Sequence, residues 1–334
     1  ISPYGELYGV NDGGGVKFNF NHENLWQTPA GTSIDSHEVK QIPNGNFMAF
    51  VPTYQLGPIP IGPWTSMAQN FGYSADGVTD EFWWMGLRIV EFDKDTHEEV
   101  WSWEPFEHFS MNDYDQYGGM WWQAIFDGFY DWMHTNAFHF DEEESVIYVS
   151  HRHLSRISKI AYPSGEVIWN MGLPAEYGTG EDNICTDLLF SFQHHIQLMD
   201  DGSLLFFDNG NLSQMLMDDP NPTTRARRIR VIDDSYCTTE WEYELPANLF
   251  GLGMGSVQLL ENENYLIYTF GSGDGQGEPT IREITPSNEV VWNYQGAQYA
   301  AWYRAYKIPS LHPQAFSVIA DNYILEDNLD VIQM

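Results

Sequence analysis

One hairpin pattern recurs five times along the chain and constrains its fold more than any other feature. Each copy alternates apolar and polar residues, passes through a polar turn and ends near a tryptophan. Alternation with a period of two is typical of half-buried β-strands. The copies cover residues 16–27, 87–103, 157–171, 229–243 and 281–294. Their tryptophans are Trp26, Trp101, Trp169, Trp241 and Trp292, whose numbers differ by 75, 68, 72 and 51. This spacing indicates repeated structural units with insertions.

A second type of hairpin follows each tryptophan. These hairpins open at His37, His134, His194, Ser256 and Tyr303. The first four contain the turns PNGN, DEEES, MDDGS and ENEN, which are rich in residues that favour tight turns. One hairpin of each type makes a four-stranded antiparallel unit, which is the blade of a β-propeller.

The repeats predict an all-β fold, a single β-propeller domain over residues 1–334 with five four-stranded blades. Four blades are contiguous in sequence. The fifth would join the C-terminal hairpin at Tyr303 to the N-terminal hairpin at residue 16, which closes the ring and leaves no free edge. Two insertions, 52–86 and 105–132, are too long for ordinary connections and are candidate site-building loops, although one of them could hide a sixth blade.

The charge of the chain excludes several kinds of partner. It carries 48 acidic and 14 basic residues, for a formal net charge of -34. Such a surface is a poor match for nucleic acid or an anionic membrane. No apolar run approaches the roughly 18 residues that span a bilayer. The sequence starts at Ile1 without a charged leader, and its cysteines, Cys185 and Cys237, could pair in an oxidising compartment. We therefore expect a secreted or periplasmic protein.

Three histidines occupy the same position in consecutive repeats. His37, His134 and His194 each open a strand that should line the central channel, so their side chains should meet at one mouth of the ring. Arg152 ends the strand pair that begins at His134, and its guanidinium offers a fixed fork of donors to an oxyanion. The sequence predicts that these four residues converge on one site.

The stretches around these residues resemble one enzyme family. They are SHEVKQIPNGNFM, DWMHTNAFHFDEEESVIYVSHRHLSRISKI, GEVIWNMG and FSFQHHIQLMDDGSLLFFDNGN. The chain resembles the arylsulfate sulfotransferases, propeller enzymes that move a sulfuryl group from an aryl sulfate to a phenol without a nucleotide donor or other cofactor. The resemblance implies that His194 becomes transiently sulfated, and that His37, His134 and Arg152 bind the sulfate. The family often carries Asp where this chain has His195, and its known bacterial members resemble six-bladed propellers.

This chemistry matches what the residues can do. Sulfuryl transfer spreads negative charge over three oxygens, as phosphoryl transfer does. It needs an in-line nucleophile, donors for those oxygens and an acid for the leaving phenolate. Further substrate-binding candidates are Trp121, Trp122 and Trp132 in the aromatic stretch 117–132, together with His195 and Asn209. No GxxxxGK[ST] loop is present, which counts against a nucleotide sulfate donor.

Two other functions remain compatible with clustered histidines. A metal-dependent lyase or oxygenase could use the same side chains as ligands, with His195 or Asp35 added. A non-catalytic protein could capture a sulfated or aromatic ligand in the same pocket. We follow the interpretation as an arylsulfate sulfotransferase. It assigns no metal and no cofactor, and its partners are a small-molecule aryl sulfate and a phenol. The sequence leaves the oligomeric state open.

Overall fold

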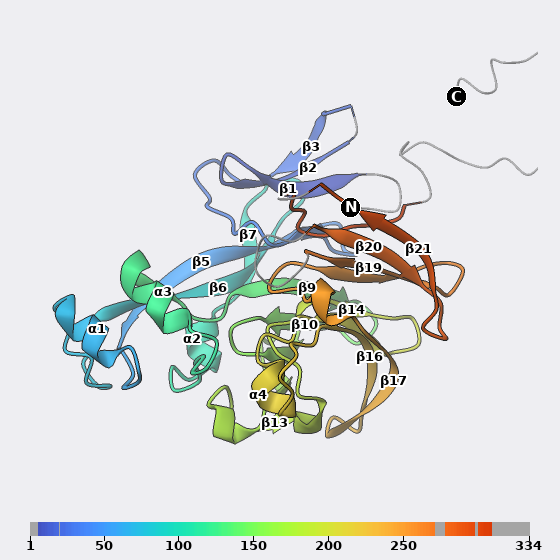
Figure 1. The fold of residues 1–334 in the computed structure, drawn as a ribbon. Helices are drawn as coiled ribbons and strands as arrows, with labels where there is room; N and C mark the ends of the chain where they lie inside the picture. Colours follow the sequence, from blue (N-terminus) through green and yellow to red (C-terminus); the bar gives the residue numbers. More distant parts are fainter. Residues whose placement is uncertain (1–5, 20, 271–277, 298–299, 309–334) are drawn as a thin grey trace, which may run out of the picture.

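The computed structural model describes residues 6–19, 21–270, 278–297 and 300–308. Strands in these residues form five small sheets, which follow one another around the molecule as the blades of a β-propeller (Figure 1). Within each sheet, consecutive strands pair antiparallel in chain order, except for the parallel strands β8 and β13 at two sheet margins. The predicted all-β fold and the count of five blades are confirmed.

The strands follow the two predicted hairpin types. The first sheet contains β1 (Leu7–Asn11), β2 (Gly14–Phe18) and β3 (Asn24–Gln27). The second contains β4 (Val39–Gln41), β5 (Phe47–Gly57), β6 (Phe82–Phe92) and β7 (Glu99–Trp103), and β8 (Phe129–Asp131) pairs parallel with β6. The third contains β9 (Thr135–Asp141), β10 (Val146–His151), β11 (Arg156–Ala161), β12 (Val167–Gly172) and the parallel β13 (Asn183–Ile184). The fourth contains β14 (His194–Leu198), β15 (Leu204–Asp208), β16 (Arg225–Ile232) and β17 (Tyr236–Glu244). The fifth contains β18 (Ser256–Leu259), β19 (Tyr265–Thr269), β20 (Thr280–Ile284) and β21 (Val290–Gln295).

The first sheet has its own N-terminal strand beside the predicted hairpin. The neighbour of β2 on one side is β1, which the repeat pattern did not predict. The segment from Trp302 to Lys307 runs along β18, where Ser256 bonds the backbone of Ala305 and Gln258 bonds that of Lys307. The second half of the predicted C-terminal hairpin falls in residues 309–334, outside the described residues.

The repeated tryptophans explain why the blades pack against one another. Trp26 stacks on Phe47 of the next sheet with ring centroids 3.8 Å apart, and Trp241 stacks on Tyr265 at 3.6 Å. The indole nitrogen of Trp101 donates to the carbonyl of Pro163 at 2.8 Å, again across a blade boundary. A large flat ring at the same place in each outer hairpin therefore contributes apolar contact between neighbouring blades.

The hydrophobic core consists of layers between adjacent sheets. One cluster lies between the first and second sheets, another between the third and fourth, and another between the fourth and fifth. The largest cluster joins the second and third sheets to the two long segments between their strands. Alternate residues of each strand supply these layers because successive side chains point to opposite faces.

The segment 52–86 largely continues the blade. Strands β5 and β6 pair without interruption from Phe47 and Phe92 to Gly57 and Phe82, and form an arm that extends from the ring in Figure 1. Pro52 is tolerated inside β5 because β4 pairs only with residues 47–49 and leaves β5 an edge strand there. The helix α1 (Thr65–Asn70) lies at the far end of this arm.

The segment 105–132 covers the arm with short elements. It contains α2 (Pro105–His108), α3 (Met120–Asp127) and β8. Arg156 ties this segment to the third blade by donating to Asp113 at 2.6 Å. Elsewhere, short helices join the strands: α4 (Ser213–Met217), η1 (Ala175–Tyr177), η2 (Thr186–Leu188) and η3 (Ala247–Leu249). The assignment of the whole chain to one domain stays a prediction.

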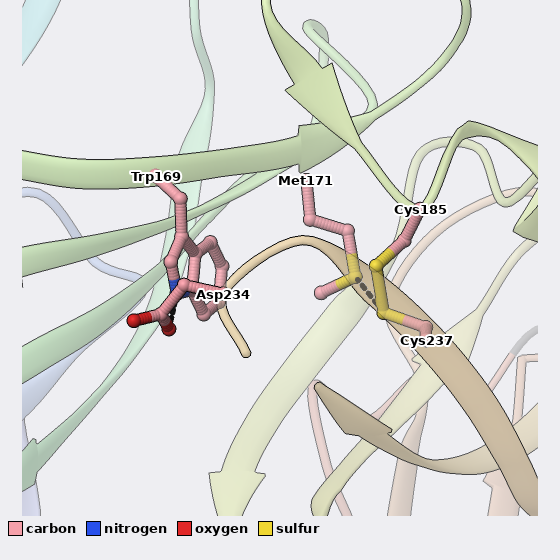
Figure 2. Close-up of a disulfide and its surroundings, with 5 residues drawn as sticks. All are labelled: Trp169, Met171, Cys185, Asp234 and Cys237. Atoms are coloured by element: carbon pink, nitrogen blue, oxygen red, sulfur yellow. Dashed lines mark hydrogen bonds between the residues drawn. A yellow bond between two sulfur atoms is a disulfide. The ribbon is translucent and has the colours of Figure 1, made fainter. Parts of the chain in front are cut away.

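Cys185 and Cys237 form a disulfide between neighbouring blades (Figure 2). Cys185 directly follows β13 at the outer edge of the third sheet, and Cys237 lies in β17, the outer strand of the fourth. Met171 packs beside it, with its sulfur 3.7 Å from that of Cys237. Nearby, the indole of Trp169 donates to Asp234 at 2.8 Å. Within the described ranges, no helix is long and apolar enough to cross a bilayer.

We expect the disulfide to stabilise the pairing of these blades. It closes a loop with a sequence separation of 52 residues, so its loss should lower the free energy of unfolding by about 2–4 kcal/mol. The double variant Cys185→Ser/Cys237→Ser should therefore unfold at lower urea concentration than the parent. A reductant should shift the parent to the same midpoint and leave the variant unchanged. A parent protein whose unfolding midpoint does not change with the reductant would contradict this role.

Candidate active site

The structure brings the three repeated histidines together. His37 lies just before β4, His134 just before β9, and His194 is the first residue of β14. The imidazole rings of His37 and His134 meet edge to face with centroids 4.6 Å apart. Tyr303 lies between His37 and His194, at ring-centroid distances of 5.5 Å and 6.2 Å. The same position in successive blades therefore delivers three imidazoles to one place.

Each of these histidines is held through its Nδ1 atom. The partner of His37 is Asp35, whose Oδ1 lies 2.5 Å from the ring nitrogen. The partner of His134 is Asp131, and that of His194 is Asn209, whose Oδ1 lies 2.7 Å from Nδ1. Side-chain oxygens in these positions accept the Nδ1–H of each ring. The Nε2 atoms are left for a ligand.

The hydrogen bonds of Asn209 fix the tautomer of His194. Its amide nitrogen donates to the carbonyls of Gly251 and Met254 at 2.8 Å and 2.9 Å, so its carbonyl oxygen must face the imidazole. That oxygen can only accept, so Nδ1 of His194 carries the proton and Nε2 carries a lone pair. Asn209 is fully buried and does not border the pocket. It therefore holds His194 in place, and a direct contact of Asn209 with substrate stays a prediction.

Arg152 is oriented by its neighbour. His153 donates from Nδ1 to the carbonyl of Asp131 at 2.6 Å, and its Nε2 accepts a hydrogen bond of 2.7 Å from Arg152. A second guanidinium nitrogen donates to the carbonyl of Leu252 at 3.2 Å. The ring of Phe192 lies under the guanidinium, 4.7 Å from its carbon. Because Arg has five N–H groups, several remain for an anionic ligand.

Burial keeps the imidazole of His194 neutral. It lowers the pKa of His194 well below its usual value, and the nearby Arg152 lowers that pKa further. Burial also lowers the pKa of His134, although Asp131 opposes the shift. The carboxyl of Asp131 is buried too, but contact with His134 outweighs burial and holds its pKa below the usual value. Burial lowers the pKa of Arg152 to about 10, so this side chain stays cationic at neutral pH.

A pocket of about 480 Å³ opens beside this cluster. His134, Arg152, His153 and Asp131 line its inner part, and α3 with Met85, Phe129 and Leu252 lines the rest. Its apolar side chains suit an aromatic ring, while its inner end presents donors. The pocket can therefore hold an aryl group next to His134, His153 and Arg152, whereas His37 and His194 are not among the residues that line it.

The predicted tryptophan wall is largely absent from the pocket. Trp121 and Trp132 are both 0% exposed. Trp121 stacks on Tyr130 with centroids 4.0 Å apart, and the indole of Trp132 donates to the carbonyl of Asp113. Trp121 packs in the core because α3 turns this face of its helix toward the arm, and Trp132 directly follows β8, which pairs with β6. Trp122 is 43% exposed but does not line the pocket described above.

His195 also faces away from the site. Its Nδ1 accepts from the backbone of Val257 at 3.3 Å, and its Nε2 lies 3.2 Å from the hydroxyl of Tyr306. The strand is irregular here, since His195 has a φ of 58° and the register shifts between His194 and Gln197. Both ring nitrogens are thus occupied, and its assignment as a substrate contact stays a prediction.

Three residues of the site were missed by the sequence reasoning. Asp131 and His153 hold His134 and Arg152, and Tyr303 fills the space between His37 and His194. Tyr303 had a usable signal, since it opens the fifth channel hairpin at the position where other repeats have histidine. The carboxylates Asp35 and Asp131 also had a usable signal in the sequence, since each lies two or three residues before a repeated histidine.

A buried pair of charged side chains helps to hold Tyr303 in place. Its hydroxyl donates to the carbonyl of Asn136 at 2.9 Å, and the adjacent Arg304 donates to the same oxygen at 2.8 Å. Arg304 also pairs with Glu38 at 2.9 Å, and both side chains are about 5% exposed. This ion pair links the segment after β21 to the residue next to His37.

The spacing of the ligand atoms bears on metal binding. Among the described residues, the one group of three whose ligand atoms lie within 4.8 Å of one another is Asp131, His134 and His153. Its members already bond one another or Arg152, whose positive charge opposes a cation. The wider arrangement of His37, His134 and His194 suits a multi-atom oxyanion better than one ion, whose ligands would lie within about 2–2.3 Å of it.

Comparison with known proteins identifies the family. The family model for arylsulfotransferase (ASST) matches residues 68–305, which include three of the four converging residues. The chain belongs to the arylsulfotransferase family. No curated protein sequence matches the chain.

Solved structures match the chain at low identity. A protein of unknown function from Bacteroides caccae is 13% identical, with a TM-score of 0.47, and the match covers 88% of this chain and 79% of that one. A streptogramin B lyase is 12% identical, with a TM-score of 0.43 and coverages of 88% and 66%. The β-propeller domain of Cps50 (Swd1) from Myceliophteria thermophila is 11% identical, with a TM-score of 0.43 and coverages of 88% and 84%. None of these similarities bears on function.

The hydrogen bonds predict opposite tautomers for two adjacent histidines. In ¹⁵N spectra, His194 should carry its proton on Nδ1 and His195 on Nε2, because their partners are a carbonyl oxygen and a backbone N–H respectively. Burial lowers the pKa of both rings far below the usual value, so neither should titrate between about pH 6 and 8.

The variant Asn209→Ala should release His194 to a mixture of tautomers and leave the signals of His195 in place. A proton on Nε2 of His194 in the parent protein would contradict the assignment.

Proposed function

We propose that this protein transfers a sulfuryl group from an aryl sulfate to a phenol through a sulfated His194, without a nucleotide donor. The observation that carries the proposal is the neutral imidazole of His194, which is held through Nδ1 and lies near enough to Arg152, His134 and His37 for their charges to lower its pKa further after burial. Membership of the arylsulfotransferase family supports the reaction class.

The first half of the proposed reaction loads the enzyme. The lone pair of Nε2 in His194 attacks sulfur, an N–S bond forms, and the bond between sulfur and the aryl oxygen breaks. The phenolate leaves with the electron pair of that bond and takes the Nε2 proton of a doubly protonated histidine, which is left neutral. His134 suits this role because it borders the pocket and because Asp131 accepts its Nδ1–H.

The second half reverses these steps with another phenol. The acceptor gives its proton to the same histidine and attacks sulfur, and the N–S bond breaks to restore the lone pair of His194. Throughout, the three sulfuryl oxygens carry negative charge. Arg152 donates to them with N–H groups that His153 and Leu252 do not use, and His37, whose ring meets that of His134 edge to face, is the further residue that we propose to bind them.

The cellular setting of the proposal is an oxidising compartment. The cross-blade disulfide between Cys185 and Cys237 persists in secreted or periplasmic proteins and is rare in the cytosol. We therefore propose that the enzyme works outside the cytoplasm, on small aromatic molecules.

Mass spectrometry tests the covalent step directly. Brief mixing with 4-nitrophenyl sulfate should add one sulfuryl group to the intact protein, and a phenol should remove it. The variant His194→Ala should gain no group and transfer none, since the covalent route loses its nucleophile.

His195→Gln is the matched control, because it alters the adjacent buried histidine outside the site. It should still become sulfated. Transfer by folded His194→Ala, with melting curves verifying the fold, would rule out this nucleophile. Stoichiometric binding of the aryl sulfate without any turnover would favour a binding protein, and activity that depends on added metal would favour the metalloenzyme.

Removal of the guanidinium should slow the chemistry. Arg152→Ala should reduce single-turnover sulfation of the enzyme by roughly 10²-fold, the scale for the loss of one preorganised oxyanion donor. The rate of sulfation of Arg152→Lys should lie between those of Arg152→Ala and the parent, because an ammonium keeps the positive charge but lacks the planar fork of N–H donors. A loss of less than about threefold in Arg152→Ala would show that this side chain does not contact the transferring group.

A further inference from the structure

The outer part of the pocket carries a negative charge that the proposed chemistry does not use. Of the described residues that line it, those with a formal charge are Asp127, Asp131 and Arg152. Asp131 is bound to His134, and Arg152 faces the position of the sulfuryl group. Asp127 stands apart from both pairs.

The surroundings of Asp127 leave its charge uncompensated. It is exposed, and within the described residues its side chain has one partner, Gln123, whose amide donates to it at 3.1 Å. It is the last residue of α3, and the last turn of this helix contains no basic residue. The C-terminal end of a helix carries a partial negative charge, which makes an aspartate unfavourable there. Helix stability therefore does not explain Asp127.

Most of the other side chains of the pocket are apolar, although Gln123 and Asn211 also line it. Met85, Met120 and Phe129 lie on the side of the arm and α3, and Leu252 lies on the opposite lip. A phenol ring placed among these side chains would have its hydroxyl near Arg152 and His134. Its far substituent would then lie on the side of Asp127.

We propose that the acceptor site selects phenols that carry a cationic substituent, with Asp127 as the residue that determines this specificity. The inference rests on the proposed function and names the acceptor class for that same site. An ammonium group on the substituent would pair with Asp127 and with the negative end of α3. A carboxylate there would meet two like charges and the field of a chain with net charge -34.

Acceptor competition tests the inference. With 4-nitrophenyl sulfate as donor, kcat/KM should be about tenfold or more higher for tyramine than for 3-(4-hydroxyphenyl)propionate at low salt, and the ratio should shrink as salt screens the charges. Asp127→Asn should reduce this ratio several-fold, and Asp127→Lys should invert it.

Asp200→Asn supplies the matched control, because it removes the same charge from an exposed turn between β14 and β15. It should leave the ratio unchanged. A ratio near one in the parent, or an equal shift in Asp200→Asn, would overturn the role of Asp127.

Calorimetry separates this inference from the reaction itself. Tyramine should bind the parent more tightly than 3-(4-hydroxyphenyl)propionate does, and Asp127→Asn should lose that preference. If no acceptor receives a sulfuryl group but this preference is present, the proposed reaction falls and the specificity of the pocket stands. If transfer occurs and neither assay shows a preference, the reaction stands and the inference falls.

Discussion

The hydrogen bond between Asn209 and His194 is the interaction on which the site most depends. It decides which ring nitrogen carries the proton, and therefore which one can react. Asn209 can accept from His194 only because its own amide is anchored to Gly251 and Met254, in the loop that leads into the fifth blade. The packing of one blade against the next thus sets the protonation pattern of a histidine. Cross-blade contacts such as Trp241 on Tyr265 help hold that arrangement.

The site depends in a similar way on the segment after β21, which lies far from the histidines in sequence. Tyr303 borders both His37 and His194, but it comes from the C-terminal part of the chain, far from either in sequence. Its position depends on Arg304, which pairs with buried Glu38 and donates to Asn136. A buried ion pair costs desolvation of both charges, and here extra hydrogen bonds compensate for it. The ion pair positions Tyr303, because it joins the N-terminal and C-terminal parts of the site.

The sequence predicted the blades and the converging residues because both follow from local periodicity. A period of two, a turn and a tryptophan can be read within fifteen residues, and equivalent repeats imply equivalent positions. The extension of β5 and β6 was missed because Pro52 signals a strand end, whereas here it lies on an edge. The burial of Trp121 depends on which way α3 faces, that of Trp132 depends on the pairing of β8 with β6, and the orientation of Asn209 depends on a distant loop. Such facts arise from tertiary contacts, which no local pattern contains.

Arg152 links the electrostatics of the site to its chemistry. In a chain with a net charge of -34, the guanidinium of Arg152 gives the proposed reaction a positive charge for an anionic sulfate that most of the surface would repel. Arg152 also lowers the pKa of His194, after burial, and so keeps the nucleophile unprotonated. A protonated ring would hold the anion more tightly but could not attack sulfur. In the proposed reaction, one fixed cation therefore supplies attraction while the neutral imidazole keeps its lone pair, and His153 keeps that cation in place without adding charge.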